Sequence, residues 1–207
     1  HNFRPNQIAR SLARQETEMI GLVNQLVEAV RIPSVIIDNK QGAYQAVSHL
    51  VEQGYRQIAL VMGPADNWSA QNRLQGYKQA LADYGLQFGP ELVISKPLSR
   101  EGGYQGFLEL IEKKPPEAIF AAHDLLAAGV VEAVKMGGYL IPQDIGVVGF
   151  EDTVVTSVID PPLTTVAQPR QRLGRRAAKK LLALVEETDP GEPIEILDCE
   201  LVVRSST

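Results

Sequence analysis

The chain has 207 residues, of which 44% are hydrophobic and 22% charged, and this composition excludes a disordered, collagen-like or coiled-coil protein. Its net charge of −5 argues against a protein that coats nucleic acid, although a local basic patch is compatible with it. The sequence has one cysteine, no apolar run near the roughly 20 residues that cross a bilayer, and no signal-peptide pattern at its start. We therefore expect a cytoplasmic protein without an intrachain disulfide or a membrane partner.

The first residues of the chain predict a short basic helix. Segment 3–15 contains three arginines and no acidic residue, and Asn6 is a suitable cap for a helix with Ile8, Ala9 and Leu12 on one face. An isolated helix below roughly 12 residues is marginal in water. We therefore expect this segment to order only against a partner.

A strand predicted at Met19–Val23 is followed too soon by the next strand, Val35–Ile37. A parallel crossover generally takes about a dozen residues or more, including its helix. A helix over residues 24–30 would rise only roughly 10 Å, less than the ~17 Å of an average strand. The sequence therefore predicts a missing segment between residues 23 and 34, either through a deletion or because the chain joins segments that are not contiguous.

From about Ser34 onward, β-branched runs alternate with helical patterns, which predicts βαβ units and an α/β fold with a parallel sheet. The later strands are predicted at Ile58–Met62, Glu91–Ser95, Ala118–Ala121, Ile145–Phe150, Leu163–Val166 and around Ile194–Val203. The helices between them have apolar faces over Ala43–Val51, Leu74–Tyr84, Tyr104–Ile111, Ala127–Val134 and Leu173–Val185.

Ligands of open α/β sheets bind beyond the carboxyl ends of the strands. That rule selects four loops, Gly63–Arg73, Ser95–Arg100, His123-Asp124 and Glu151-Asp152, which together supply an indole, guanidinium groups, an imidazole and carboxylates. This mixture suits a polyhydroxylated or anionic small molecule, because arginine and carboxylates bind hydroxyl groups from opposite sides. It does not by itself indicate catalysis.

Each of these residues also has a structural interpretation. Asp124 directly precedes a helical pattern, which favours an N-cap, and Ser69 is a suitable cap for the helix predicted over Leu74–Tyr84. Arg73 is compatible with a solvated helix face or with a ligand contact, and Trp68 with a lid or a packing anchor. Glu151 stands at a strand end, where a functional role is favoured.

Motifs of dinucleotide, phosphate, acyl-transfer and zinc enzymes are absent from the sequence. Three scattered histidines and one cysteine also argue against a metal cluster. We therefore expect no catalytic residue, no cofactor and no metal. An enzymatic interpretation rests only on the paired carboxylates of Glu151 and Asp152.

A series of short motifs runs nearly end to end along the chain: Arg4-Pro5-Asn6, Ile20-Gly21-Leu22-Val23, Asp38-Asn39, His49-Leu50, Arg73-Leu74, Gly76-Tyr77, Ala118-Ile119-Phe120, Pro142–Ile145, Val147–Phe150, Pro161–Val166 and Gln168-Pro169. Their order and spacing resemble the lactose-repressor/galactose-repressor (LacI/GalR) family of bacterial transcription regulators.

The resemblance implies a periplasmic-binding-protein-like fold of two doubly wound parallel-sheet subdomains, of which the N-terminal one is incomplete here. It implies a homodimer, and a repressor controlled by a small-molecule effector, a sugar or sugar-derived metabolite, bound between the subdomains. Residues 1–17 resemble the hinge that follows a helix-turn-helix, which this chain lacks, and residues 18–207 resemble the effector-binding and dimerisation core.

In relatives the hinge helices enter the minor groove of operator DNA, where the residue matching Leu12 acts as an apolar wedge. The arginines are then expected to contact phosphates or the groove rim. The resemblance assigns DNA binding to Arg4, Asn6, Ala9, Arg10, Leu12 and Arg14.

The effector-binding positions carry over with changes. Ser69 and Arg73 match positions that bond the effector, Glu151 stands where an aspartate is common, and His123 where an asparagine is common. Leu98 replaces a frequent aromatic residue, so Trp68 is the candidate for stacking on the ligand. These changes predict a somewhat different effector.

A solute-binding protein for uptake, with the same fold and no role on DNA, is the alternative. The hinge-like segment and the absence of a signal peptide count against it.

Overall fold

The computed structural model describes residues 22–23, 33–112 and 115–207. The chain divides into two compact units, one made of residues 1–38 and 169–198 and the other of residues 39–168 and 199–207. We call them the three-stranded unit and the six-stranded unit after their sheets. The predicted α/β class with mainly parallel sheets is confirmed.

The six-stranded sheet has the order β4-β3-β5-β6-β7-β9, and all neighbouring strands are parallel except β7 and β9. The strands are β3 (Ile58–Met62), β4 (Val93–Ser95), β5 (Ala118–Ala121), β6 (Gly146–Glu151), β7 (Thr164–Ala167) and β9 (Glu200–Val202).

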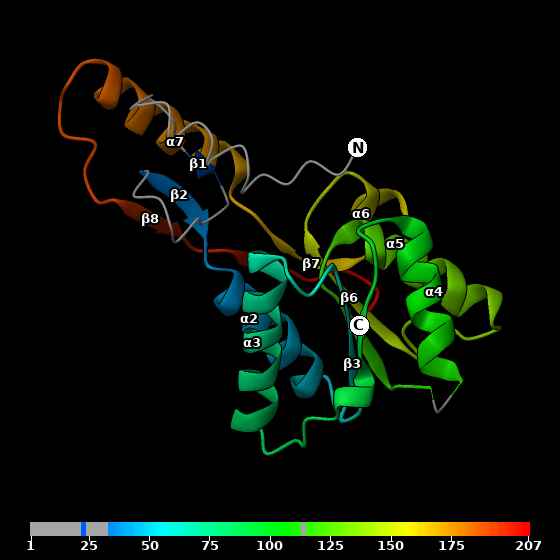
Figure 1. Cartoon of the computed structure of the whole chain (residues 1–207). Coiled ribbons are helices and arrows are strands. Elements are labelled where there is room, and N and C mark those ends of the chain that lie inside the picture. Colours follow the sequence, from blue (N-terminus) through cyan, green and yellow to red (C-terminus); the bar gives the residue numbers. More distant parts are fainter. Residues whose placement is uncertain (1–21, 24–32, 113–114) are drawn as a thin grey trace. The chain divides into compact units, whose positions relative to one another are not determined.

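Helices cover both faces of this sheet. The helices α2 (Asn39–Glu52) and α3 (Trp68–Asp83) lie on one face, and α4 (Arg100–Ile111) and α5 (Asp124–Met136) lie on the other (Figure 1). Gly103 lets α4 approach α5, because a Cβ atom there would lie only 1.9 Å from the Leu126 carbonyl oxygen. Since both faces are covered, the central strands are continuously apolar and buried, as in β3.

Two predicted strands differ from the structure. The predicted strand Glu91–Ser95 begins as a 3₁₀ turn at Pro90–Leu92, because proline lacks the N–H group that a sheet ladder requires, and only β4 follows as a strand. The predicted strand around Ile194–Val203 is two strands in different sheets, β8 (Ile194–Leu197) and β9.

The three-stranded unit contains β1 (Leu22–Val23), β2 (Ser34–Ile37) and β8, in that order and parallel, together with α7 (Arg170–Val185). The residues before β1 and residues 24–32 lie outside the described part of the chain. The predicted missing segment between residues 23 and 34 and the boundary at residue 17 therefore stay predictions.

The apolar face predicted for α7 is only partly buried. Leu173 is buried, whereas Leu181 and Val185 are 39% and 54% exposed. Lys180 is buried instead, because its ammonium group donates hydrogen bonds to the carbonyl oxygens of Pro190 and Glu192.

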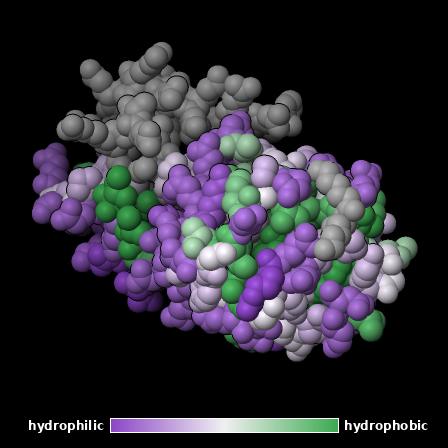
Figure 2. Space-filling model, turned by 90° about the horizontal axis from the view of Figure 1, so that it is seen from below, coloured by the Kyte–Doolittle hydropathy of each residue, from purple (hydrophilic) through white to green (hydrophobic). Residues whose placement is uncertain are grey.

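The face of the molecule in Figure 2 shows hydrophobic patches interspersed with hydrophilic residues. None of the helices described is long and apolar enough to span a membrane.

Candidate functional site

The topology of the six-stranded sheet fixes one edge for ligand binding. Consecutive strands β3 and β4 are neighbours, and β5 then pairs with the other side of β3. The order therefore reverses between β3 and β5, and in open α/β sheets ligands bind at such a switch point, outside the carboxyl ends of the strands. The loops that follow β3, β4, β5 and β6 all leave the sheet at this edge, because these strands are parallel.

Arg73 is the most constrained of the predicted site residues. It extends from α3 and is only 5% exposed. Its Nε donates to Oδ1 of Asn39 at 2.8 Å and its Nη1 donates to the carbonyl oxygen of Ala122. The guanidinium lies 3.8 Å from the centroid of the Phe150 ring, a cation–π contact. The alternative of a solvated helix face is therefore wrong, because this side chain is buried at the switch point.

Burial lowers the pKa of Arg73 to about 10, because the charged guanidinium loses its hydration. The carboxylates of Glu151 and Asp124 act in the opposite direction and favour the charged form. Arg73 is thus a buried cation at neutral pH, held in place by two hydrogen bonds and an aromatic ring.

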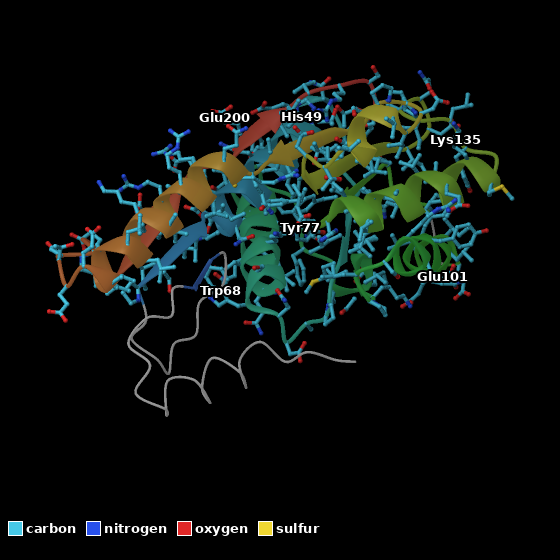
Figure 3. All side chains as sticks on the ribbon, turned by 90° about the horizontal axis from the view of Figure 1, so that it is seen from above. His49, Trp68, Tyr77, Glu101, Lys135 and Glu200 are labelled. Atoms are coloured by element: carbon cyan, nitrogen blue, oxygen red, sulfur yellow. The ribbon has the colours of Figure 1, made fainter. Side chains whose placement is uncertain are left out.

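The amino-terminal turn of α3 positions two other predicted residues. Its N-cap is Asn67, whose Oδ1 accepts from the backbone N–H of Ala70 at 3.1 Å, so the predicted capping by Ser69 is wrong. Ser69 is half-buried and lies four residues before Arg73, on the same face of the helix. Trp68 is the first residue of α3 and half-buried, with Tyr77 further along the helix (Figure 3).

His123 caps α5 and contacts Glu151. Its Nδ1 accepts from the backbone N–H of Leu125 at 3.2 Å, and its Nε2 lies 3.3 Å from Oε2 of Glu151. A ring that accepts at Nδ1 carries its proton on Nε2, which then donates to the carboxylate. Burial and the nearby Arg73 cation lower the pKa of His123, and Asp124 opposes them. The neutral imidazole can therefore make both contacts, accepting at Nδ1 and donating at Nε2.

Asp124 is the first residue of α5, so the interpretation of Asp124 as the N-cap is wrong. Its Oδ2 accepts from the N–H and Oγ1 of Thr153 at 2.7 and 3.0 Å, and its Oδ1 accepts from Oγ1 of Thr165 at 2.9 Å. Burial raises the pKa of Asp124, and these hydrogen bonds partly offset the shift. Asp124 thus ties the loop after β6 and strand β7 to the start of α5.

Glu151 ends β6 with a backbone φ of 120°, a region that side chains rarely adopt. Such conformations cluster at functional sites because the surrounding structure has to hold them. Its Oε1 accepts from Nε2 of Gln168 at 3.3 Å, and its side chain is 22% exposed. The strand end therefore presents a carboxylate at the switch-point edge.

The carboxylates of Glu151 and Asp152, paired in the sequence, have different partners. Asp152 accepts from Nη2 of Arg204 at 2.7 Å and from Oγ1 of Thr156 at 3.0 Å. Glu151 faces His123 instead. The pair is thus divided between a structural ion pair and the candidate site.

Leu98 follows β4 and is 43% exposed. It leans over the end of β3, because a Cβ atom on Gly63 would lie 2.7 Å from its Cδ2. His123 contacts Glu151 directly, and Arg73 interacts electrostatically with both, so we call these three residues the cluster. Leu98 and Trp68 lie along the same edge without being part of those contacts.

Three residues that contact this cluster are not among the site residues predicted from the sequence, namely Asn39, Phe150 and Gln168. Gln168 directly follows β7, so the rule of strand ends could have found it. Phe150 reads as an ordinary core residue, and nothing in its local pattern indicates that it supports a cation.

The predicted hinge residues Arg4, Asn6, Ala9, Arg10, Leu12 and Arg14 lie outside the described residues. Within residues 22–23, 33–112 and 115–207, no group of three or more histidine, cysteine or acidic residues is arranged to hold a metal ion.

Residues 47–207 match the family described as the periplasmic binding protein-like domain. Among curated relatives, the HTH-type transcriptional repressor CytR of Escherichia coli is 35% identical over 187 residues, which cover 90% of this chain and 55% of the relative. The chain thus spans about half the length of the curated relatives it matches.

Solved structures show the same relationship. The transcription regulator CcpA of Lactococcus lactis aligns with a TM-score of 0.91 and 30% identity, over 97% of this chain and 73% of that one. A LacI family transcriptional regulator from Enterococcus faecium with bound ribose aligns with a TM-score of 0.83 and 30% identity, over 97% of this chain and 74% of that one.

Proposed function

Because the chain belongs to the LacI family of transcriptional regulators, we propose that it forms the effector-binding core of a DNA-binding repressor controlled by a small molecule. The relatives that match it are transcriptional regulators. We propose in addition that this protein acts as a repressor and not as an enzyme. We further propose that the protein is a cytoplasmic homodimer, and that it contacts operator DNA through residues 1–17 and a helix-turn-helix.

The cluster of Arg73, His123 and Glu151 carries the proposal. A hydroxyl group both donates and accepts hydrogen bonds, and this cluster offers a guanidinium donor and a carboxylate acceptor at one sheet edge. Arginine held by Asn39 and Ala122 is pre-organised, which reduces the entropy lost on binding. The ribose bound to the Enterococcus faecium relative is a ligand of this chemical kind.

Effector binding is expected to act on the loop after β6. A ligand hydroxyl bound to Glu151 pulls on a strand end whose next residues reach Thr153, and Asp124 ties Thr153 to α5. The movement therefore reaches α5 rather than staying at the site. The effector strengthens DNA binding if the effector-bound arrangement of this loop and α5 is the one that binds operator. It weakens DNA binding if the effector-free arrangement is the one that binds operator.

Linkage between the two ligands tests the proposal. The protein at its full encoded length is used to select operator fragments from genomic DNA, and operator affinity is measured with and without a panel of sugars. Reciprocity requires that operator change the affinity for an active sugar by the same factor. Sugar binding without any such linkage would favour the uptake-type solute-binding alternative.

The hinge assignment is tested separately with Leu12→Ala. Removal of an apolar wedge is expected to weaken operator binding and to leave sugar affinity nearly unchanged. Equal operator affinity of Leu12→Ala and wild type would remove residues 1–17 from the DNA interface.

A further inference from the structure

We propose that helix α7 carries a face through which two copies of this chain pack against each other, with the two helices antiparallel about a two-fold axis. The proposed function assigns no surface to a contact between copies, so this inference goes beyond it and does not depend on DNA or effector binding. Three observations on the three-stranded unit support it: an exposed apolar side of α7, a helical glycine without a neighbour, and opposite charges at the two ends of the helix.

One side of α7 is apolar and exposed. We call this side the α7 face, and with 3.6 residues per helical turn it consists of Gly174, Ala178, Leu181 and Val185. All four residues are exposed, although α7 packs on β1 and β2 and buries Leu173. An apolar stripe that stays exposed next to a buried one is typical of a contact with another molecule.

Gly174 differs from the other helical glycines. A Cβ atom added at Gly174 would meet no described atom within 4 Å. At every other glycine inside a described helix, a Cβ atom would lie at most 2.9 Å from another atom, and at Gly76, Gly103 and Gly129 that atom belongs to the backbone of a neighbouring helix. Glycine lowers helix stability, so its use inside helices is explained by such close approaches. The described residues do not supply the neighbour that Gly174 could accommodate.

The residues of the α7 face complement each other in an antiparallel pair. When the two-fold axis crosses α7 next to Lys179, Gly174 of one copy lies opposite Val185 of the other. Ala178 of one copy then lies opposite Leu181 of the other. A small residue faces a branched one at both positions, so the side chains of one helix fit the grooves of the other.

The charges at the ends of α7 favour the same orientation. Arg172 and Arg175 lie in its first turns, and Glu186 and Glu187 directly follow its last residue. All four are exposed, and none has an ion-pair partner among the described residues. The antiparallel register brings Arg172 of one copy to Glu187 of the other. A parallel pair would bring like charges together, so the charges select the antiparallel one.

Sedimentation equilibrium of the complete chain over a series of concentrations measures the association. One helix face buries less than the ~800 Å² per partner of a standard interface, so we expect reversible association. The weight-average mass should rise with concentration towards twice its value in dilute solution. Ala178→Glu places a charge in the middle of the α7 face and should raise the dissociation constant at least tenfold.

Ala82→Glu, at an exposed position of α3, is the matched control and should leave the dissociation constant unchanged. Equal masses of the wild type and Ala178→Glu at every concentration would overturn the proposal. This readout requires neither operator nor sugar, so a failure of the proposed function would leave it unaffected.

Charge reversal tests the orientation of the two helices. Arg172→Glu and Glu187→Arg each bring like charges together and should each weaken the association. The double variant restores opposite charges and should regain most of the affinity. High salt should reduce the differences between these variants, because it screens exposed charges. A double variant that associates no better than either single one would contradict the antiparallel arrangement.

Gly174→Gln separates association from folding. Glutamine forms helices better than glycine, and the position is open in the single chain, so the free energy of unfolding in dilute solution should not fall. Association should weaken at least tenfold, because the longer side chain holds the two helices apart. Association of Gly174→Gln as tight as that of the wild type would contradict the close approach at this glycine.

Discussion

The two units hold their buried charges differently. In the six-stranded unit, Arg73 and Asp124 are buried against side chains of other elements, with Phe150 beside the guanidinium and Thr165 on the carboxylate. In the described part of the three-stranded unit, Lys180 is buried against backbone carbonyl oxygens of the segment that follows its own helix, and Leu182 and Ile196 are each 57% exposed. A charged group survives burial only where its partners are fixed. The six-stranded unit is therefore the one whose buried charges are brought together from several elements, as a pre-organised binding site requires.

The largest expected effect comes from the core of the six-stranded unit. Phe107→Ala removes a fully buried ring that packs edge-on against Tyr139, and should lower the free energy of unfolding by about 3–5 kcal/mol. Leu182→Ala in α7 should cost below about 0.5 kcal/mol, as surface substitutions do. Urea denaturation followed by circular dichroism compares the two variants.

Fluorescence of Trp68, the single tryptophan of the chain, reports on the six-stranded unit in the same titration. If Leu182→Ala lowered the free energy of unfolding as much as Phe107→Ala does, the comparison between the units would be wrong. Such a loss would show that Leu182 on α7 is packed as tightly as the core.

The next effect concerns the buried cation. Arg73→Met keeps apolar contact with Phe150 but removes the donors to Asn39 and Ala122. Two acceptors left without their donor should cost about 1–3 kcal/mol each when they stay buried, and less where water enters. Sugar binding should be lost as well. A variant with wild-type unfolding free energy and wild-type sugar affinity would remove Arg73 from both roles.

The elements of the six-stranded unit could be predicted because burial on both faces leaves a continuous apolar signal. Strand β3 at Ile58–Met62 and strand β5 at Ala118–Ala121 were predicted to the residue. The split between β8 and β9 could not be predicted, since the alternating pattern continues while the chain passes from one sheet to the other. Sheet membership depends on distant strands, which local periodicity does not report.

The sequence could predict that the candidate site residues meet at one edge of the sheet, but not the contacts that they make there. Strand ends selected Arg73, His123 and Glu151, but both helix caps were misassigned, to Ser69 and Asp124. Asparagine, serine, aspartate and histidine are all able to cap, so neighbouring candidates differ only in backbone geometry. The partners of a buried charge come from other elements, and for that reason they remain hidden in the sequence.

The smallest expected effect is a pH dependence at His123. Because its pKa is lowered from 6.5 in the folded protein, the unfolded chain binds more protons at mildly acidic pH. The stabilisation is complete above about pH 6.5 and is lost as the pH falls through the lowered pKa. His123→Asn can still cap α5 and does not titrate, so its melting temperature should fall less between pH 7 and pH 5 than that of the wild type.

His49 has to be separated from this effect, because burial lowers its pKa too and gives the same sign. Its Nε2 lies 2.9 Å from Oγ1 of Thr207, away from the switch-point edge. His49→Gln should therefore reduce the pH dependence of the melting temperature without changing that of sugar affinity. His123→Asn should reduce both, since of these two histidines it is His123 that contacts Glu151. Identical pH profiles of sugar affinity in the two variants would show that the imidazole of His123 caps the helix but does not position the carboxylate.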